Sequence, residues 1–158
     1  MKLAVAPERT LILGWNKRAP TILVELDSYV APGSSVTVVA DYPREELTLG
    51  DRISGLKNQT YECLEGDTTD RRTLDSLQIE TYDHVFILCY SDTHDMQQAD
   101  ARTFLTLLHL RDMAVKDETP FSIVSEMLDL RNRELAEAAQ VDAFIVSEHL
   151  VSLMMAQL

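Results

Sequence analysis

The sequence predicts a doubly wound α/β domain, a parallel six-stranded sheet with helices on both faces. Short apolar runs alternate regularly with segments of helical periodicity, which is typical of a parallel sheet with crossover helices. The run Val85–Tyr90 is apolar throughout, as expected of a central strand buried on both faces. A length of 158 residues is enough for one such domain with a sizeable core. In the doubly wound arrangement the strand order is 3-2-1-4-5-6.

The elements can be placed along the chain from the apolar runs and the residues that interrupt them. We expect strands at residues 10–13, 36–40, 61–64, 85–90, 121–124 and 143–146. We expect helices at residues 19–30, 71–77, 95–116 and 131–140, with a weak helical stretch between 41 and 53. Pro20 suits the first turn of its helix, and Asp70 is a candidate N-cap. Residues 1–8 form a linker or a non-native start, and residues 9–158 form one domain that ends within an apolar helix.

Charge and cysteine content exclude several classes of partner. There are 26 acidic and 14 basic residues, a net charge of −12, which argues against nucleic acid and anionic membrane surfaces. No apolar stretch approaches the roughly 18 residues that span a bilayer, so we expect no direct membrane contact. Cys63 and Cys89 lie in apolar runs and are interpreted as buried free thiols in a reducing, cytoplasmic compartment.

The turn after the first strand resembles a dinucleotide-binding fingerprint. The three positions of the G-x-G-x-x-G/A pattern read Gly14, Asn16 and Ala19, and Asp41 follows the second strand where a ribose-binding carboxylate belongs. This agreement of position, strand and helix favours a Rossmann-like scaffold. The departure is Asn16, because a side chain at the second glycine position obstructs the approach of a pyrophosphate.

Cofactor-binding candidates cluster around this turn and the neighbouring strand ends. Trp15, Lys17 and Arg18 are available to cover or hold a ligand, although exposed aromatic and basic residues are commonplace. The full candidate set is Gly14, Trp15, Asn16, Lys17, Arg18, Ala19, Asp41 and Asp67.

Carboxylates outnumber cations along the predicted carboxyl edge of the sheet. Such an edge repels a polyphosphate and suits a hard cation such as Ca²⁺, which takes oxygen ligands. The candidate metal ligands are Asp92, Asp95, Glu126 and Asp129. The alternative is that acids following strands cap the next helix, which applies to Asp70, Asp95 and Asp129.

No catalytic constellation is present, so we expect a protein that is not an enzyme. The sequence has no evident nucleophile–base pair, no C-x-x-C motif and no serine in a G-x-S-x-G turn. The predicted helix 95–116 is apolar beyond the single stripe that a helix on a sheet needs. Its apolar residues are Met96, Ala99, Phe104, Leu105, Leu107, Leu108, Leu110, Met113 and Val115. This surplus indicates either a deeply buried helix or a contact between subunits.

Several stretches together resemble the RCK domain (regulator of potassium conductance), in particular its version in the CASTOR/POLLUX ion-channel family and bacterial relatives. The resemblance covers nearly the whole chain from about Arg9, and the general pattern is shared with TrkA nucleotide-binding domains. The stretches are LGWNKRAP at 13–20, VVAD at 38–41, GD at 66–67, SDTHD at 91–95, SEMLD at 125–129 and FIVS at 144–147.

The resemblance implies a cytoplasmic regulatory domain of a cation or potassium channel. Such domains assemble with other RCK domains into a gating ring, bind a small ligand or ion and act on the pore domain. Ligands differ between branches of the family and include NAD(H), ATP, ADP and Ca²⁺, so the cofactor is left open. The alternatives are the NAD(H)-binding half of an oxidoreductase, or a Rossmann-like module that only oligomerises.

Overall fold

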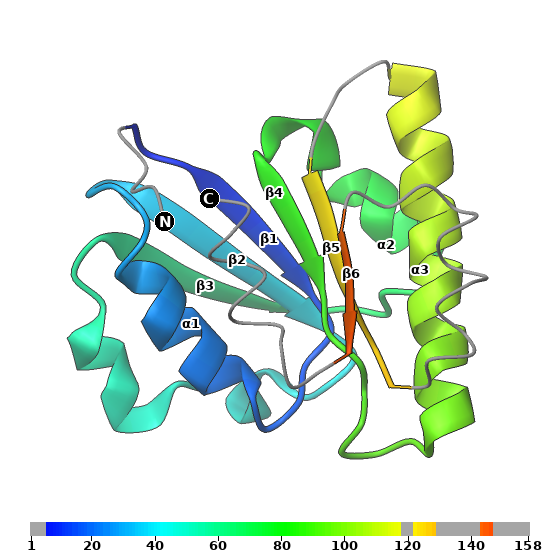
Figure 1. The fold of residues 1–158 in the computed structure, drawn as a ribbon, viewed down its shortest axis with the longest axis horizontal. Helices are drawn as coiled ribbons and strands as arrows, with labels where there is room; N and C mark the ends of the chain where they lie inside the picture. The colour runs from blue at the N-terminus through cyan, green and yellow to red at the C-terminus, as the bar shows by residue number, and fades with distance from the viewer. Residues whose placement is uncertain (1–5, 118–121, 129–142, 147–158) are drawn as a thin grey trace.

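The computed structural model describes residues 6–117, 122–128 and 143–146 (Figure 1). Strands and helices alternate along these residues, as predicted. The elements are β1 (Arg9–Leu13), α1 (Ala19–Asp27), β2 (Ser34–Ala40), β3 (Gln59–Glu65), α2 (Arg71–Ser76), β4 (His84–Ile87), α3 (Met96–Asp117), β5 (Ser122–Met127) and β6 (Ala143–Val146). Three short 3-10 helices, Arg44–Glu46, Gly50–Gly55 and Ile79–Thr81, lie in the connections.

The six strands form one parallel sheet in the order β3-β2-β1-β4-β5-β6, which confirms the predicted topology. Leu11 of β1 lies opposite Thr37 of β2 on one side and Val85 of β4 on the other. The strand order reverses between β1 and β4, and this is the switch point where open parallel sheets bind ligands, outside the carboxyl ends of the strands. We call that side of the sheet the carboxyl edge.

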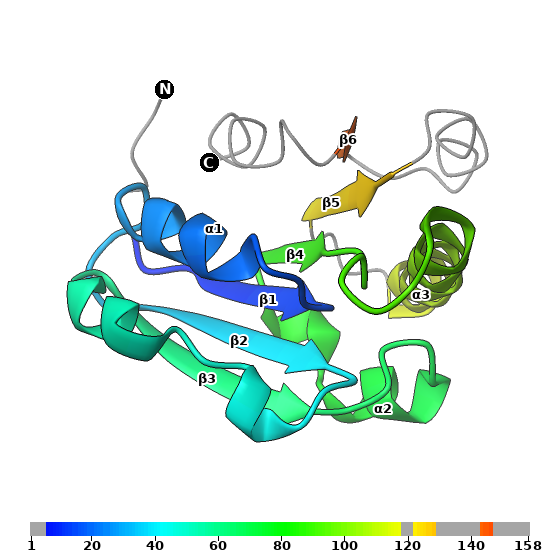
Figure 2. The same cartoon turned by 90° about the horizontal axis from the view of Figure 1, so that it is seen from below.

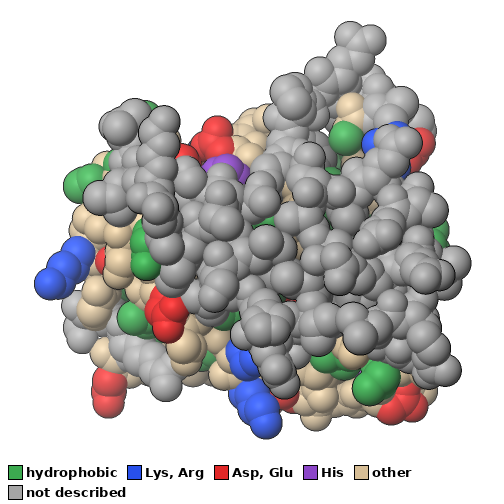
Figure 3. All heavy atoms as spheres, in the orientation of Figure 1, with side chains coloured by type: hydrophobic (Ala, Val, Ile, Leu, Met, Phe, Trp, Pro, Cys, Tyr) green, Lys and Arg blue, Asp and Glu red, His purple; other side chains and the backbone are tan. Residues whose placement is uncertain are grey.

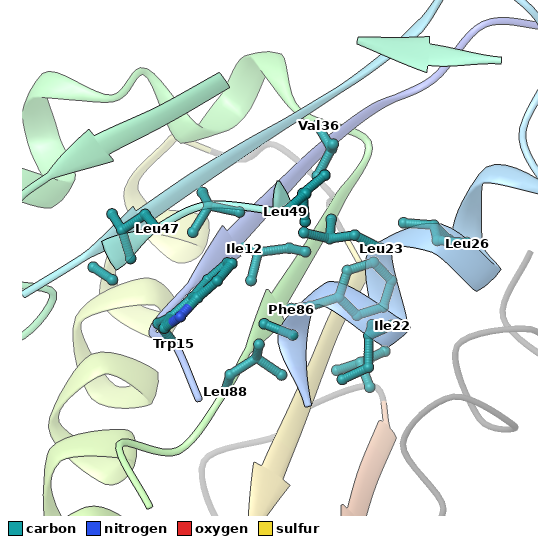
Figure 4. Packing of buried hydrophobic residues seen from close by; sticks show 14 of the residues in the cluster. Ile12, Trp15, Ile22, Leu23, Leu26, Val36, Leu47, Leu49, Phe86 and Leu88 are labelled. Carbon is teal, nitrogen blue, oxygen red and sulfur yellow. The ribbon is translucent and has the colours of Figure 1, made fainter. Parts of the chain in front are cut away.

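Helices cover both faces of the sheet, α1 on one and α2 with α3 on the other (Figure 2). Side chains of alternate residues explain the two layers, because successive residues of a strand point to opposite faces. Ile12 and Phe86 pack with Leu23 of α1 (Figure 4), whereas Leu11 and Leu13 pack against α3. Both faces of β4 are therefore buried, as its unbroken apolar run predicted, and both faces of β1 are buried as well.

Local signals account for several element ends. Pro20 lies in the first turn of α1, and the Asp70 side chain accepts a hydrogen bond from the Arg72 amide at the start of α2, both as predicted. The weak helical stretch is two 3-10 helices rather than an α-helix. β4 ends at Ile87, earlier than predicted, and the Cys89 amide instead bonds to a side chain. The predicted helix 131–140 and the segment after residue 146 lie outside the described residues.

The two cysteines are free thiols, as predicted, but only Cys89 is buried. Burial next to the Glu126 carboxylate raises the pKa of the Cys89 thiol, which keeps it protonated and unreactive. Cys63 is half-buried on β3 and lines a mainly apolar hollow of about 410 Å³ between β3 and residues 44–49. This hollow lies against the edge strand rather than at the switch point.

Candidate functional site

Gly14 forms the tight turn between β1 and α1 that the fingerprint requires. Its φ of +102° lies in the region that favours glycine, and a Cβ atom there would collide with the backbone oxygen of Leu88 beyond β4. The Gly14 amide donates to the Val39 oxygen (2.9 Å), which ties the turn to β2 as well. The glycine is therefore required by close approach of three backbone segments at the switch point.

Asn16 is turned into the protein and does not project over the turn. It is fully buried, and its Nδ2 donates to the Cys89 oxygen (2.9 Å) and to Glu126 Oε1 (3.0 Å). Its Oδ1 accepts from the Arg18 amide (2.9 Å). The predicted obstruction by this side chain is therefore wrong, because internal hydrogen bonds hold it away from the exposed side of the turn.

The other residues of the turn divide between the core and the surface. Trp15 is only 6% exposed and packs with Leu47 and Leu88 in the α1 layer (Figure 4), so the indole supports the turn from inside rather than covering a ligand. Lys17 is exposed. Among the described residues, the backbone amides of Trp15, Asn16 and Lys17 have no hydrogen-bond acceptor. These amides precede the positive end of the α1 dipole.

Glu126 is the centre of a buried network that joins this turn to β4 and β5. The residue is fully buried, and its Oε1 accepts from the Cys89 amide (2.9 Å) in addition to Asn16. Its Oε2 accepts from Arg18 Nε (3.2 Å) and Nη2 (3.0 Å), and Arg18 Nη2 also reaches Ser91 Oγ (3.2 Å). Both carboxylate oxygens are thus saturated, and the charge is balanced by one guanidinium. We call these side chains, Asn16, Arg18 and Glu126, the Glu126 network.

The predicted cation site is not assembled in the described part of the chain. Within that part, no three His, Cys, Asp or Glu side chains gather where they could hold a metal, and acidic side chains are scattered over the face in Figure 3. Asp92 is exposed, and Asp95 caps α3 by accepting from the Gln98 amide (2.8 Å). Asp129 lies outside the described residues. The capping alternative therefore holds for Asp95, and Glu126 is bound to Arg18 instead.

Asp41 and Asp67 follow β2 and β3 and are joined by an arginine from α3. Arg102 Nη2 lies 3.3 Å from Asp41 Oδ2 and 3.3 Å from Asp67 Oδ1. The two aspartate side chains are 54% and 48% exposed, so each keeps oxygens open to solvent. A hydrogen bond from the Thr69 hydroxyl lowers the pKa of Asp67. The structure thus brings these two predicted residues to one cation, which balances part of their charge.

Tyr90 lies beneath this ion pair and completes the cluster. Its hydroxyl accepts from the Asp41 amide (3.1 Å) and lies 2.8 Å from Thr68 Oγ1. The Arg102 guanidinium carbon is 4.6 Å from the ring centroid, and Tyr42 stacks on the ring at 5.9 Å with an interplanar angle of 21°. Burial raises the pKa of the Tyr90 phenol. We call Asp41, Asp67, Tyr90 and Arg102 the Tyr90 cluster.

The sequence interpretation missed both Arg102 and Tyr90 as site residues. Tyr90 was included in an apolar strand, although its position at the end of that run was a signal that it could reach the carboxyl edge. Arg102 lies in the polar first half of the long helix, before the apolar part that begins at Phe104. Nothing in the sequence indicates which strand ends that helix crosses.

Comparison with known proteins identifies the family. The family model described as the TrkA-N domain matches residues 10–147. A probable ion channel CASTOR of Oryza sativa subsp. japonica is 30% identical over 186 residues, covering 96% of this chain and 21% of the relative. The chain therefore spans about a fifth of the length of this curated relative. Within the described residues, no helix is long and apolar enough to cross a membrane.

Solved structures show the same fold at low sequence identity. GsuK bound to ADP superposes with a TM-score of 0.63 at 17% identity, covering 90% of this chain and 32% of GsuK. The GsuK channel bound to NAD gives 0.61 at 16% identity, with 89% and 22% covered. The human SLO3 gating ring gives 0.61 at 10% identity, with 88% and 24% covered. The TrkA-N family model matches residues 10–147, which is most of the chain, and the likeness to CASTOR-type channels agrees with it. The chain therefore belongs to the TrkA-N domain family.

Proposed function

We propose that this chain is the ligand-binding regulatory domain of a cation channel, and that an adenine nucleotide binds at its carboxyl edge. The observation that carries this proposal is the Gly14 turn at the switch point, with three amides and Lys17 on one side and the exposed Asp41 carboxylate on the other. The domain, residues 9–158, would lie in the cytoplasm, with residues 1–8 as a linker.

The phosphate end fits the turn between β1 and α1. The backbone amides of residues 15–17 precede the α1 N-terminus, where backbone donors and the helix dipole favour an anion. The exposed ammonium group of Lys17 adds a second source of positive charge. The Asn16 side chain is buried and does not project over the turn, so it does not occupy the space that a glycine leaves free at this position in the usual fingerprint.

The ribose end fits Asp41. This carboxylate follows β2, the position from which dinucleotide-binding folds bond the ribose hydroxyls, and about half of its surface is open. Arg102 balances part of the charge of Asp41 and Asp67, which reduces the repulsion that the acidic edge exerts on a nucleotide.

A mononucleotide fits this edge better than a dinucleotide. In a dinucleotide site the second half lies beyond β4 and β5, where the buried Asn16 and Glu126 side chains and the partly exposed Arg18 side chain are bonded to one another. ADP is therefore the probe of choice. The same observation disfavours the alternative of an NAD(H)-binding half of an oxidoreductase, because a nicotinamide would have to displace Arg18 or Glu126. The GsuK structures contain ADP in one case and NAD in another.

Regulation would follow from assembly of several copies into a ring below the pore domain. α3 exposes Met96, Leu105 and Leu108, which are 44–48% exposed, on a helix that is otherwise packed on the sheet. A ligand that binds one ring conformation more tightly shifts the equilibrium of the pore toward that state, and no catalytic step is needed. The human SLO3 gating ring contains a domain of the same fold.

Thermal unfolding of the chain with ADP, ATP, NAD⁺, Ca²⁺ or Mg²⁺ tests the proposal. ADP at a hundredfold excess over its Kd should stabilise the fold by about 2.7 kcal/mol. Asp41→Ala should abolish most of this shift. Asp75→Ala is the matched control, because Asp75 is similarly exposed (56%) and similarly paired with an arginine but lies on α2. The proposal is wrong if ADP gives no shift, or if Asp41→Ala and Asp75→Ala reduce it equally. A shift with Ca²⁺ alone would indicate that the domain binds a divalent cation rather than a nucleotide.

A further inference from the structure

We propose that Tyr90 closes the adenosine end of the site and is the residue that sets nucleotide affinity. The inference rests on the proposed function and goes beyond it, because it makes the observed arrangement a closed state that the nucleotide must open. Three observations support it: the path of the Tyr90 side chain across the sheet, the contacts that hold it, and a buried donor beside it that lacks a partner.

The Tyr90 side chain crosses the carboxyl end of β1. It belongs to the segment that follows β4, yet its hydroxyl bonds to the Asp41 amide after β2 and to Thr68 after β3. In the sheet order β3-β2-β1-β4, strand β1 separates β4 from β2, and neighbouring strands lie about 4.8 Å apart. The ring therefore lies over the end of β1, beside Asp41, where the adenosine of a bound nucleotide belongs.

Stacking and hydrogen bonding hold the ring in this place. Tyr90 is only 3% exposed, between the Arg102 guanidinium and the ring of Tyr42. The Tyr42 hydroxyl is in turn 3.1 Å from Thr93 Oγ1, in the loop that leads from Tyr90 to α3. A nucleoside thus cannot enter beside Asp41 without displacing a ring that is packed and bonded on several sides.

Arg102 has a buried hydrogen-bond donor to which a ligand could supply the acceptor. Its Nη2 is shared by Asp41 and Asp67, but its Nε is buried and has no hydrogen-bond partner among the described residues. A buried donor without an acceptor costs free energy that an oxygen from a ligand would recover. Displacement of Tyr90 would expose this Nε on the side of the site, so a ribose or phosphate oxygen could accept from it.

The closed ring predicts a penalty on affinity. If the site is competent only when Tyr90 has moved, the observed Kd equals the intrinsic Kd divided by the fraction of open molecules. Removal of the side chain removes this penalty. Arg102 belongs to α3, and the loop after Tyr90 leads into the same helix. Opening would therefore also move α3, which exposes Leu105 and Leu108.

Titration calorimetry with ADP and with pyrophosphate tests the inference on three proteins. Relative to the unchanged chain, Tyr90→Ala should bind ADP about tenfold more tightly, the gain expected if about one molecule in ten is open. Tyr90→Phe keeps the ring but loses the bonds to Asp41 and Thr68, so a gain of about threefold is expected. Pyrophosphate lacks a nucleoside, and its Kd should not change in either variant.

Tyr82→Ala is the matched control. Tyr82 is also buried (8% exposed) and also stacked by an arginine, with Arg9 4.4 Å from its ring, but it precedes β4 at the opposite edge of the sheet. Its removal should leave the Kd for ADP unchanged. Thermal unfolding of each variant checks folding, and Tyr90→Phe decides the question if Tyr90→Ala does not fold.

The outcomes separate the two proposals. Tighter ADP binding in the Tyr90 variants alone, with pyrophosphate unchanged, supports closure by Tyr90, even if the unchanged chain binds too weakly to measure. ADP binding to the unchanged chain with no gain in the variants overturns closure and leaves the proposed function standing. An equal gain for pyrophosphate, or a gain in Tyr82→Ala, overturns closure as general loosening. Failure of every protein to bind ADP overturns both proposals.

Discussion

Two arginines at the same edge of the sheet are used in opposite ways. Arg18 pairs with Glu126, which is fully buried, and amides from Asn16 and Cys89 complete the carboxylate's hydrogen bonds. Arg102 pairs with Asp41 and Asp67, whose side chains are about half exposed, and lies over Tyr90. In the first arrangement the carboxylate is fully buried and its hydrogen bonds are complete, whereas the second retains exposed carboxylate oxygens and, among the described residues, a buried Nε without a partner.

The difference shows that burial, rather than the presence of acids and cations, decides what an ion pair can do. A buried charge that loses its partner is strongly destabilising, so the Glu126 network is expected to be a structural lock on the Gly14 turn. Exposed pairs contribute little to stability and exchange partners easily. The Tyr90 cluster is therefore the one of the two that can respond to a ligand.

The largest effect is expected when the Glu126 carboxylate is removed from its network. Glu126→Ala leaves the Arg18 guanidinium without its carboxylate, and it deprives the buried Asn16 amide and the Cys89 amide of an acceptor. The Arg18 side chain is partly exposed, so the cost comes mainly from the two buried donors, at about 1–3 kcal/mol each together with the lost ion pair. We expect a loss of about 3–5 kcal/mol in the free energy of unfolding, measured by urea denaturation. Glu62→Ala, at an exposed position of β3, is the control and should change stability by less than about 0.5 kcal/mol. A similar small loss for Glu126→Ala would contradict the structural role.

A smaller loss is expected when the network loses one neutral member. Asn16→Ala removes the amide that bridges Cys89 and Glu126 and leaves the Arg18 amide without its acceptor. The cost of such unsatisfied buried groups is about 1–3 kcal/mol, again measurable by urea denaturation. Asn16→Asp places a second acceptor opposite Glu126 and should cost at least as much. A neutral result for both would mean that water replaces the amide and that the network is open.

Arg102→Ala should cost only about 1 kcal/mol, although it removes two ion pairs and a stacked ring contact. The reason is that the aspartates remain solvated once the guanidinium is gone. Arg71→Ala is a matched comparison, because Arg71 also pairs with two exposed carboxylates, Asp75 and Asp112. A loss near that of Glu126→Ala would erase the contrast between the two arginines.

The smallest expected effect is on how the free energy of unfolding falls at alkaline pH. Burial holds the pKa of the folded Tyr90 above its ordinary value near 10, so the phenol ionises first in the unfolded chain. Its contribution is fully present below pH 10 and is lost as the pH rises, by up to about 0.8 kcal/mol at pH 10.5. Tyr90→Phe should flatten the fall of unfolding free energy between pH 9 and 10.5. An unchanged slope would show that Tyr90 ionises freely in the folded protein.

Much of the fold could be predicted because its determinants are local. The apolar runs of β1 and β4 and Gly14, Pro20 and Asp70 carry their signals within a few residues, and all appear where expected. Parallel connectivity leaves few strand orders, and the Rossmann-like turn at Gly14 favours the one observed. The end of β4 was misplaced because Cys89 and Tyr90 are as apolar as strand residues, while their hydrogen bonds go to Glu126, Asp41 and Thr68.

The candidate site was predicted only in outline, since its composition depends on contacts over long sequence distances. The sequence placed Asp41, Asp67 and Glu126 at the same edge but gave no means of telling a metal ligand from an ion-pair partner. That choice was made by Arg18, which is 108 positions from Glu126, and by Arg102, which is 61 positions from Asp41. The correction of the cation site follows from these pairings.

By itself, the sequence determined the doubly wound sheet, the glycine turn at the switch point and the acidic character of the carboxyl edge, because periodicity, glycine geometry and charge are properties of neighbouring residues. Only the tertiary structure decided that Asn16 points inward, that Glu126 is locked by Arg18 and that Tyr90 lies across the end of β1 beneath Arg102. The physical reason is that each of these depends on which helix and strand ends meet, and burial at those meeting points sets the role of each charge.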